Sequence, residues 1–182
     1  EIKHDGYRLM SRISGGEVRL FNREGLDWTE QLPRQAAAIA ALNLSECWLD
    51  GKLVQPDTDG VADYHALQQA FEAGHCAGLH YYLFDLPFHD GTDLRTLPLE
   101  QRRARLKKLL AGTRHALLRY SDSFTATTLD VLEGACTLNH EGVIGKRRGS
   151  LYRDGERNLD WIKLDCQRED SPLLPLTESQ AR

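Results

Sequence analysis

The sequence has no long hydrophobic run and no N-terminal targeting segment. None of its apolar stretches approaches the roughly 20 residues that a membrane-spanning helix needs, and no basic segment followed by an apolar one marks a signal peptide. No internal repeat is visible either, which argues against a repeat architecture. We therefore expect a protein without a membrane partner.

Closely spaced cysteines are also missing. The four cysteines, Cys47, Cys76, Cys136 and Cys166, are scattered, and no pair has the spacing of a zinc knuckle or of a redox motif. We expect them to be reduced thiols in a cytoplasmic protein.

An excess of positive charge is lacking as well. The 23 Lys and Arg residues are outnumbered by 27 Asp and Glu residues, and the net charge of −4 argues against a nucleic-acid binder that uses its whole surface. Positive charge gathers in two blocks. Residues 102–108 are typical of the solvated face of a helix, whereas residues 146–157 lie in a turn-rich stretch where a phosphate contact is more plausible.

The pattern of apolar residues predicts one α+β domain. Strands at 7–13 and 18–22 form a hairpin around Gly15-Gly16, and further strands are expected at 47–54, 79–86, 115–120, 142–146 and 159–164. Helices are expected at 33–42, 64–73, 98–110 and 127–138. Hairpins mixed with helices, without regular alternation, indicate the α+β class. Residues 167–182 are polar and predict a linker or frayed tail.

The first eight residues carry the strongest chemical signal. Lys3 stands two residues before the Asp5-Gly6 pair, and Arg8 follows three residues after Asp5. A deprotonated lysine can attack phosphorus and hold a nucleotide as a phosphoramidate. The planar fork of Arg8 suits a ribose or a phosphate. The alternative is a strand end with ordinary surface charges.

Four further stretches contain residues suited to nucleotide chemistry. They are Asn22-Arg23-Glu24-Gly25, residues 81–86 with Phe84, residues 141–146 with Glu141 and Lys146, and Trp161-Ile162-Lys163. Each has a structural alternative: Phe84 as a core residue, Glu141 as a surface charge or helix cap, and Lys163 as a strand-edge residue.

Taken in order, these motifs resemble those of ATP-dependent DNA ligases. The order is Glu-x-Lys-x-Asp-Gly-x-Arg, Arg-x-Gly, Asp-Gly, Phe-Asp-Leu, Glu-Gly-Val-x-x-Lys and Trp-x-Lys. The wording of EIKHDGYR, YYLFDLPF, EGVIGKRR and DWIKL is similar to the ligase module of the bacterial end-joining, multifunctional ligases. The resemblance extends from residue 1 to about residue 166.

The resemblance implies a nucleotidyltransferase (adenylation) domain at residues 1–166, with mainly antiparallel sheets flanked by helices. The oligonucleotide-binding domain that follows in the family is expected to be absent. ATP would be the cofactor, together with Mg²⁺ or Mn²⁺. The partners would be nicked or broken double-stranded DNA and end-joining repair proteins. A monomer in the bacterial cytoplasm, associated with the nucleoid, is expected.

The resemblance also implies roles for individual residues. Lys3 would attack the α-phosphate of ATP and expel pyrophosphate, and the AMP would then pass to a DNA 5′-phosphate. The other residues would hold the nucleotide or a metal: Glu1 and Ile2 the adenine, Arg8 the ribose or phosphate, Arg23 the ribose or the nick, Phe84 the base by stacking, Lys163 the α-phosphate, Lys146 the nucleotide, and Glu141 a divalent metal.

Two positions depart from the family pattern. The usual Asp-Gly-Glu is Asp50-Gly51-Lys52 here, and the usual Trp-x-Lys-x-Lys ends in Asp165. We expect either that Lys52 and Asp165 form a charge-reversed ion pair or that the site is decaying, with impaired activity in both cases. Two alternatives therefore stay open: a non-catalytic nucleotide- or DNA-binding remnant, and an RNA ligase or capping-type transferase.

Overall fold

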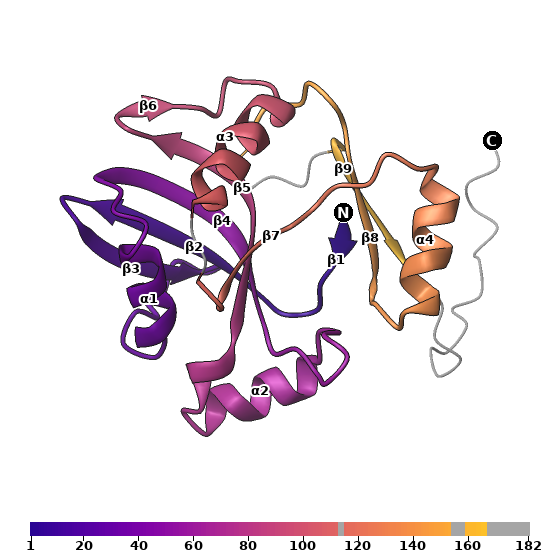
Figure 1. Cartoon of the computed structure of the whole chain (residues 1–182), viewed down its shortest axis with the longest axis horizontal. Helices are drawn as coiled ribbons and strands as arrows, with labels where there is room; N and C mark the ends of the chain where they lie inside the picture. Colours follow the sequence, from indigo (N-terminus) through magenta and orange to yellow (C-terminus); the bar gives the residue numbers. More distant parts are fainter. Residues whose placement is uncertain (113–114, 154–158, 167–182) are drawn as a thin grey trace.

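The computed structural model describes residues 1–112, 115–153 and 159–166, which form two sheets with helices packed around them (Figure 1). The α+β prediction is confirmed. The tail expected at residues 167–182 lies outside the described residues. Within the part of the chain that is described, no helix is long and apolar enough to cross a membrane.

The larger sheet begins with the predicted hairpin. Its strand order is β3-β2-β4-β5-β6, all antiparallel, and β7 pairs with β5 in parallel. Gly15 and Gly16 have φ angles of 58° and 83°, as a tight hairpin turn requires. The strands are β2 (Tyr7–Ser14), β3 (Glu17–Asn22), β4 (Glu46–Val54), β5 (His80–His89), β6 (Thr92–Asp93) and β7 (Leu118–Tyr120).

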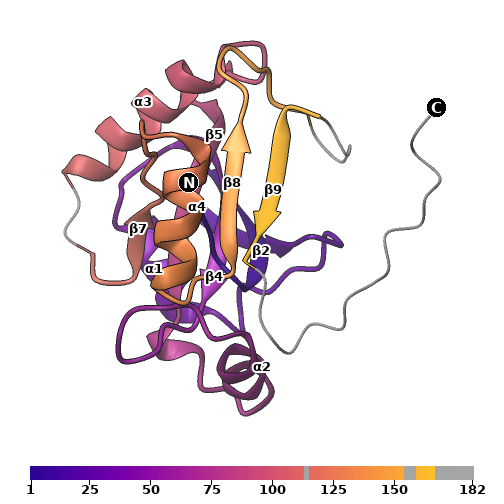
Figure 2. The ribbon, with the colours of Figure 1, turned by 90° about the vertical axis from the view of Figure 1, so that its right-hand side faces the viewer.

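The smaller sheet joins the two ends of the described chain. β1 (Ile2–Lys3) pairs with β8 (Gly142–Lys146), which pairs with β9 (Trp161–Asp165). β8 and β9 run side by side in Figure 2. β1 was not predicted from the sequence, because two residues are too few to show a periodicity. This sheet carries the first residues of the chain to the motifs near residues 141–165.

The helices cover the sheets at separate places. α3 (Leu99–Ala111) packs on β5, α1 (Pro33–Ala40) on β3, and α4 (Thr128–Thr137) on β8 (Figure 1). α2 (Tyr64–Glu72) begins after Asp63, whose side chain accepts a hydrogen bond from the backbone N–H of Ala66 at 2.9 Å and so caps the helix N-terminus. A short 3₁₀ helix, Cys76–Gly78, precedes β5.

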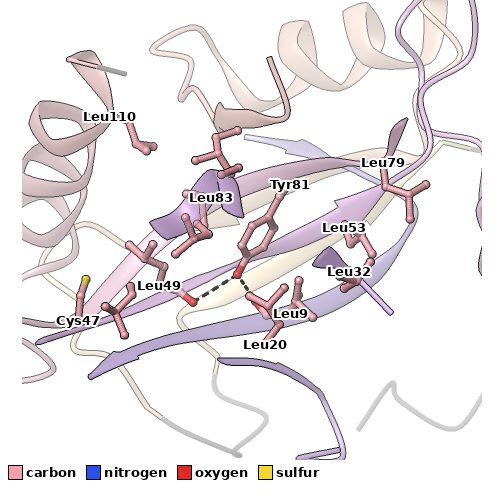
Figure 3. Close-up of a cluster of buried hydrophobic side chains, with 14 of the residues drawn as sticks. Leu9, Leu20, Leu32, Cys47, Leu49, Leu53, Leu79, Tyr81, Leu83 and Leu110 are labelled. Carbon is pink, nitrogen blue, oxygen red and sulfur yellow. Dashed lines mark hydrogen bonds between the residues drawn. The ribbon is translucent and has the colours of Figure 1, made fainter. Parts of the chain in front are cut away.

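The core between the large sheet and its helices consists mostly of leucines, with Tyr81 and Cys47 among them (Figure 3). Tyr81 is fully buried, and its hydroxyl donates to the carbonyl of Leu9 at 2.7 Å while accepting from Ser11 Oγ at 3.0 Å. A buried phenol therefore has its polar atom satisfied, which removes most of the cost of burying it.

The basic block at residues 102–108 was predicted to be solvated, and this is wrong for two of its members. Arg102 and Arg103 are buried on the inner face of α3. Arg102 forms a two-pronged ion pair with Asp85, with Nε–Oδ1 at 2.8 Å and Nη2–Oδ2 at 2.9 Å. A buried guanidinium is tolerable when a carboxylate and carbonyls bind its N–H groups.

The prediction of four reduced thiols is also wrong. Cys136 and Cys166 form a disulfide with a Cα–Cα distance of 5.4 Å, whereas Cys47 and Cys76 are free and buried. The chain leaves α4 directly into β8 and returns along β9, so the β8–β9 pairing brings the two cysteines together. Their separation of 30 residues gave no local signal of this contact.

Candidate active site

A cavity of about 560 Å³ is lined by residues from both sheets. Lys3, Ile144 and Lys163 come from the small sheet, whereas Arg8 and Phe84 come from the large one. Arg23, at the end of the first hairpin, is exposed and lines the same cavity. The roles that the family resemblance implies require Lys3, Phe84 and Lys163 to share one pocket, and the fold places all three in this cavity.

Lys3 lies between two carboxylates. Its Nζ is 2.5 Å from Glu141 Oε1 and also donates a hydrogen bond to Asp165 Oδ1. The register explains this arrangement, because Gly142 pairs with Lys3 on one side and with Asp165 on the other. A Cβ at Gly142 would collide with the carbonyl of Leu164, so only glycine allows the strands to approach this closely.

The two carboxylates set the charge state of the Lys3 amine. Partial burial by itself would lower the pKa of Lys3, but the hydrogen bonds and charges of Asp165 and Glu141 outweigh it, and the pKa is raised above 10.5. Lys3 is therefore an ammonium in this arrangement, and it must lose a proton before it can act as a nucleophile.

Arg8 is held in place by a buried carboxylate. Its Nη2 is 2.6 Å from Asp50 Oδ2, and its Nε donates to Asp50 Oδ1 at 3.1 Å. Tyr152 completes this cluster, because its hydroxyl donates to Asp50 Oδ2 at 2.9 Å and accepts from Arg8 Nη2 at 3.3 Å. Arg8 therefore reaches the cavity as an oriented donor and still has 40% of its side chain exposed.

Lys52 lines the cavity but does not pair with Asp165, so the predicted charge-reversed ion pair is wrong. Lys52 Nζ donates to the carbonyl of His4 at 2.8 Å, whereas Asp165 contacts Lys3. The two residues come from different sheets, Lys52 from β4 and Asp165 from the end of β9. Burial lowers the pKa of Lys52, and the charges of Glu141 and Asp5 oppose this effect only in part.

Two aromatic rings form an apolar part of the cavity wall. Phe84 and Trp161 meet edge to face, with ring centroids 5.7 Å apart. Lys146 Nζ lies 4.5 Å from the centroid of Phe84 and 4.1 Å from that of Trp161, and 4% of its side chain is exposed. Such a cation near two ring faces is stabilised by their quadrupoles.

The other expected nucleotide contacts lie elsewhere. Glu1 and Lys146 form an ion pair at 2.8 Å and line a second cavity of about 670 Å³, together with residues of α3 and residues 123–126. Ile2 pairs with Val143 inside the small sheet, and it is not among the residues that line either of these two cavities. Burial lowers the pKa of Lys146, while the Glu1 carboxylate acts in the opposite direction.

Glu141 has an oxygen suited to a metal ion. Its Oε2 is buried and has no hydrogen-bond partner among the described residues, while Oε1 contacts Lys3. Glu141 contacts Lys3, which lines the cavity, but is not itself one of the lining residues. A carboxylate oxygen with free lone pairs at this position fits a hard divalent cation.

Sequence reasoning missed three contributors to the site. Tyr152 follows a loop without a recognisable motif, the Asp50 carboxylate was noted only as part of an Asp-Gly pair, and Arg103 was assigned to the surface. The roles of Asp50 and Tyr152 depend on which strands meet, so no local pattern marks these two residues. For Arg103 the sequence offers one signal. Arg102 and Arg103 are spaced from Leu99 and Leu106 so that all four lie on the same face of the helix, which indicates burial.

Comparisons with known proteins agree on one family. The family model described as "ATP dependent DNA ligase domain" matches residues 1–165. The chain is 52% identical over 179 residues to the multifunctional non-homologous end joining protein LigD of Pseudomonas aeruginosa, covering 98% of this chain and 21% of that protein. Identity to the LigD of Mycobacterium tuberculosis is 33% over 171 residues, covering 90% of this chain and 21% of that protein.

Solved structures give the same result. The ligase domain of M. tuberculosis LigD matches with a TM-score of 0.80 and 31% identity, over 91% of this chain and 53% of that one. A mycobacterial DNA ligase D complexed with ATP and MES matches with a TM-score of 0.79 and 31% identity, over 90% of this chain and 52% of that one. The chain spans about a fifth of the length of the LigD proteins that it matches.

Proposed function

The chain belongs to the ATP-dependent DNA ligase domain family, and we propose that it is the adenylation domain of an end-joining DNA ligase, with Lys3 as its nucleophile. The observation that supports this most directly is the position of Lys3, which lines a cavity beside Glu141 together with Arg8, Phe84 and Lys163. A nucleotide needs an apolar surface for its base and cations for its phosphates, and this cavity has both.

The proposed reaction begins on the Lys3 amine. After loss of a proton, the Nζ lone pair attacks the α-phosphorus of ATP, and an N–P bond forms. The bond from the α-phosphorus to the bridging oxygen breaks, and pyrophosphate leaves with that electron pair. The nitrogen then loses a second proton to water, and the product is AMP joined to Lys3 as a phosphoramidate.

The surrounding residues would stabilise the nucleotide. Phe84 would stack on the adenine, Arg8 would bind the ribose or phosphate, and Arg23 the ribose or the nick. Lys163 would neutralise charge that develops on the α-phosphate. Glu141 would hold Mg²⁺ or Mn²⁺, which supplies charge neutralisation when bound. Glu1, Ile2 and Lys146 do not line this cavity, so they would act on the nucleotide indirectly, through the residues that do line it.

The adenylate would next be transferred to the 5′-phosphate of nicked or broken double-stranded DNA, and a 3′-hydroxyl would displace it. The full joining reaction and any end-joining partner proteins belong to this proposal, because the chain spans about a fifth of its relatives. Action on a bacterial chromosome would place the protein in the cytoplasm at the nucleoid, and we propose that it acts as a monomer.

The contact between Asp165 and Lys3 supports a second candidate, a nucleotide-binding remnant without chemistry. A carboxylate at this position holds the nucleophile protonated and repels a phosphate. In that case ATP would bind the cavity without forming a covalent product. An RNA ligase or capping-type transferase would instead be distinguished by its nucleic-acid substrate or by a preference for GTP.

Labelling with ATP or GTP followed by denaturing electrophoresis separates these candidates. We expect label from ATP and a divalent metal to stay on the parent protein and to be lost in Lys3→Ala. Lys107→Ala is the control, since the Lys107 side chain is 65% exposed and does not line the Lys3 cavity. An adduct that persists in Lys3→Ala would contradict the assignment of the nucleophile. ATP binding without any adduct would favour the remnant.

A further inference from the structure

Arg103 connects parts of the molecule that belong to different sheets. Its Nη1 donates to Glu1 Oε1 at 2.7 Å and to the carbonyl of Phe84 at 3.0 Å. Its Nη2 donates to the carbonyl of Ser121 at 2.6 Å, and the guanidinium carbon lies 4.9 Å from the ring centroid of Tyr120. Only 8% of the Arg103 side chain is exposed, and these contacts together fix the position of its guanidinium group.

Both ends of this connection lead to the candidate active site. Glu1 is two residues from Lys3, and its carbonyl accepts from the N–H of Ile144 at 2.8 Å, which fixes it to the small sheet. Phe84 belongs to β5 of the large sheet, and its ring lines the cavity. Arg103 therefore ties the strand that carries Lys3 to the strand that carries the aromatic wall.

The Glu1 carboxylate has few other partners. Its Oε1 is paired with Lys146 at 2.8 Å, and its Oε2 accepts from Ser121 Oγ at 3.0 Å. Lys146 also lies against the rings of Phe84 and Trp161. Without Arg103, the buried carboxylate would depend on Lys146 for its neutralisation, and the carbonyl of Phe84 would lose a charged donor.

We propose that Arg103 is a positioning residue for nucleotide binding, which sets the aromatic wall of the cavity relative to the Lys3 strand. The proposal rests on the proposed function of the cavity as an ATP site. Arg103 does not line that cavity, so it acts through Glu1 and Phe84 and not by touching the phosphates. Its removal should weaken binding of the base and leave binding of the triphosphate group unchanged.

The test compares Arg103→Met, Arg103→Lys and the control Arg105→Met, since Arg105 is an exposed arginine of the same helix. Calorimetry measures the Kd for ATP and for inorganic tripolyphosphate, which lacks the base. We expect Arg103→Met to weaken ATP binding about tenfold, as the loss of a charged hydrogen bond predicts, and to leave tripolyphosphate binding unchanged. Arg103→Lys should be intermediate, and Arg105→Met should match the parent.

Lysyl-AMP formation gives a second readout. KM for ATP should rise more in Arg103→Met than the rate at saturating ATP falls.

An unchanged ATP affinity in folded Arg103→Met, or an equal loss of affinity for tripolyphosphate, would overturn the proposal. If Arg103→Met does not fold, Arg103→Lys decides, and parental ATP affinity in that variant would overturn it. If the parent protein binds ATP without forming an adduct, only the proposed adenylation function is contradicted. If it does not bind ATP, both that function and the role of Arg103 are contradicted.

Discussion

Replacing Asp165 by Asn removes one of the two carboxylates that contact the Lys3 amine. The side chain keeps its size, so the β8–β9 pairing should be preserved. The Asp165 side chain is 65% exposed, whereas that of Lys3 is 13% exposed, and their contact therefore lies at the rim of the cavity. We expect Asp165→Asn to increase the rate of lysyl-AMP formation at neutral pH.

The size of the effect follows from the charge that is removed. Two unit charges about 4 Å apart interact by about 4 kcal/mol at an effective dielectric of about 20. Because Asp165 is largely exposed, solvent screening reduces this to about 1 kcal/mol. That corresponds to about a fivefold change in the population of neutral Lys3, and thus in rate, if deprotonation precedes attack.

A higher pH should increase the rate of lysyl-AMP formation. The carboxylates raise the pKa of Lys3, so the neutral amine becomes more abundant as the pH rises. Asp165→Asn should lower that pKa, and the profile of rate against pH should move to lower pH by about 0.7 unit. Glu141 stays in place and continues to stabilise the ammonium.

The assay is single-turnover formation of the labelled adduct between pH 6 and 10, at saturating ATP and metal. Asp122→Asn is a matched control, because the Asp122 side chain is 67% exposed and also contacts a lysine, Lys107 at 3.2 Å, away from Lys3. An unchanged profile in Asp165→Asn, or a rate that falls, would show that this contact does not limit the reaction.

Two further predictions concern stability. Arg102→Met should lower the free energy of unfolding by about 3–5 kcal/mol, because it leaves the buried Asp85 carboxylate without its partner; urea denaturation against the exposed-site variant Arg105→Met measures this loss. The pKa of His4 is lowered to about 4 by burial, followed by the charges of His140 and Lys52, so the unfolded chain binds more protons between about pH 6.5 and 4. Stability should therefore fall as the pH falls through this window, by about 3 kcal/mol for His4 alone, and His4→Gln should reduce the slope; an unaltered slope would contradict this account of His4.

The local elements could be predicted from the sequence because their causes are local. Two glycines with positive φ form the first hairpin, and Asp63 and Thr127 cap the helices that follow them. The order of short motifs was sufficient to indicate the family. It also predicted that Lys3 and Phe84 would line one pocket, since residues that act on one ligand must converge.

The tertiary structure decided the partners of the charged residues. Lys3 contacts Asp165 because β8 lies between β1 and β9, and this pairing joins residues that are 162 positions apart. Lys52 lies in the other sheet and binds the carbonyl of His4 instead. Arg103 and Cys136 depend in the same way on which elements pack together. Sequence spacing specifies which side chains share a strand or a helix face, but the pairing of distant strands specifies which charges meet.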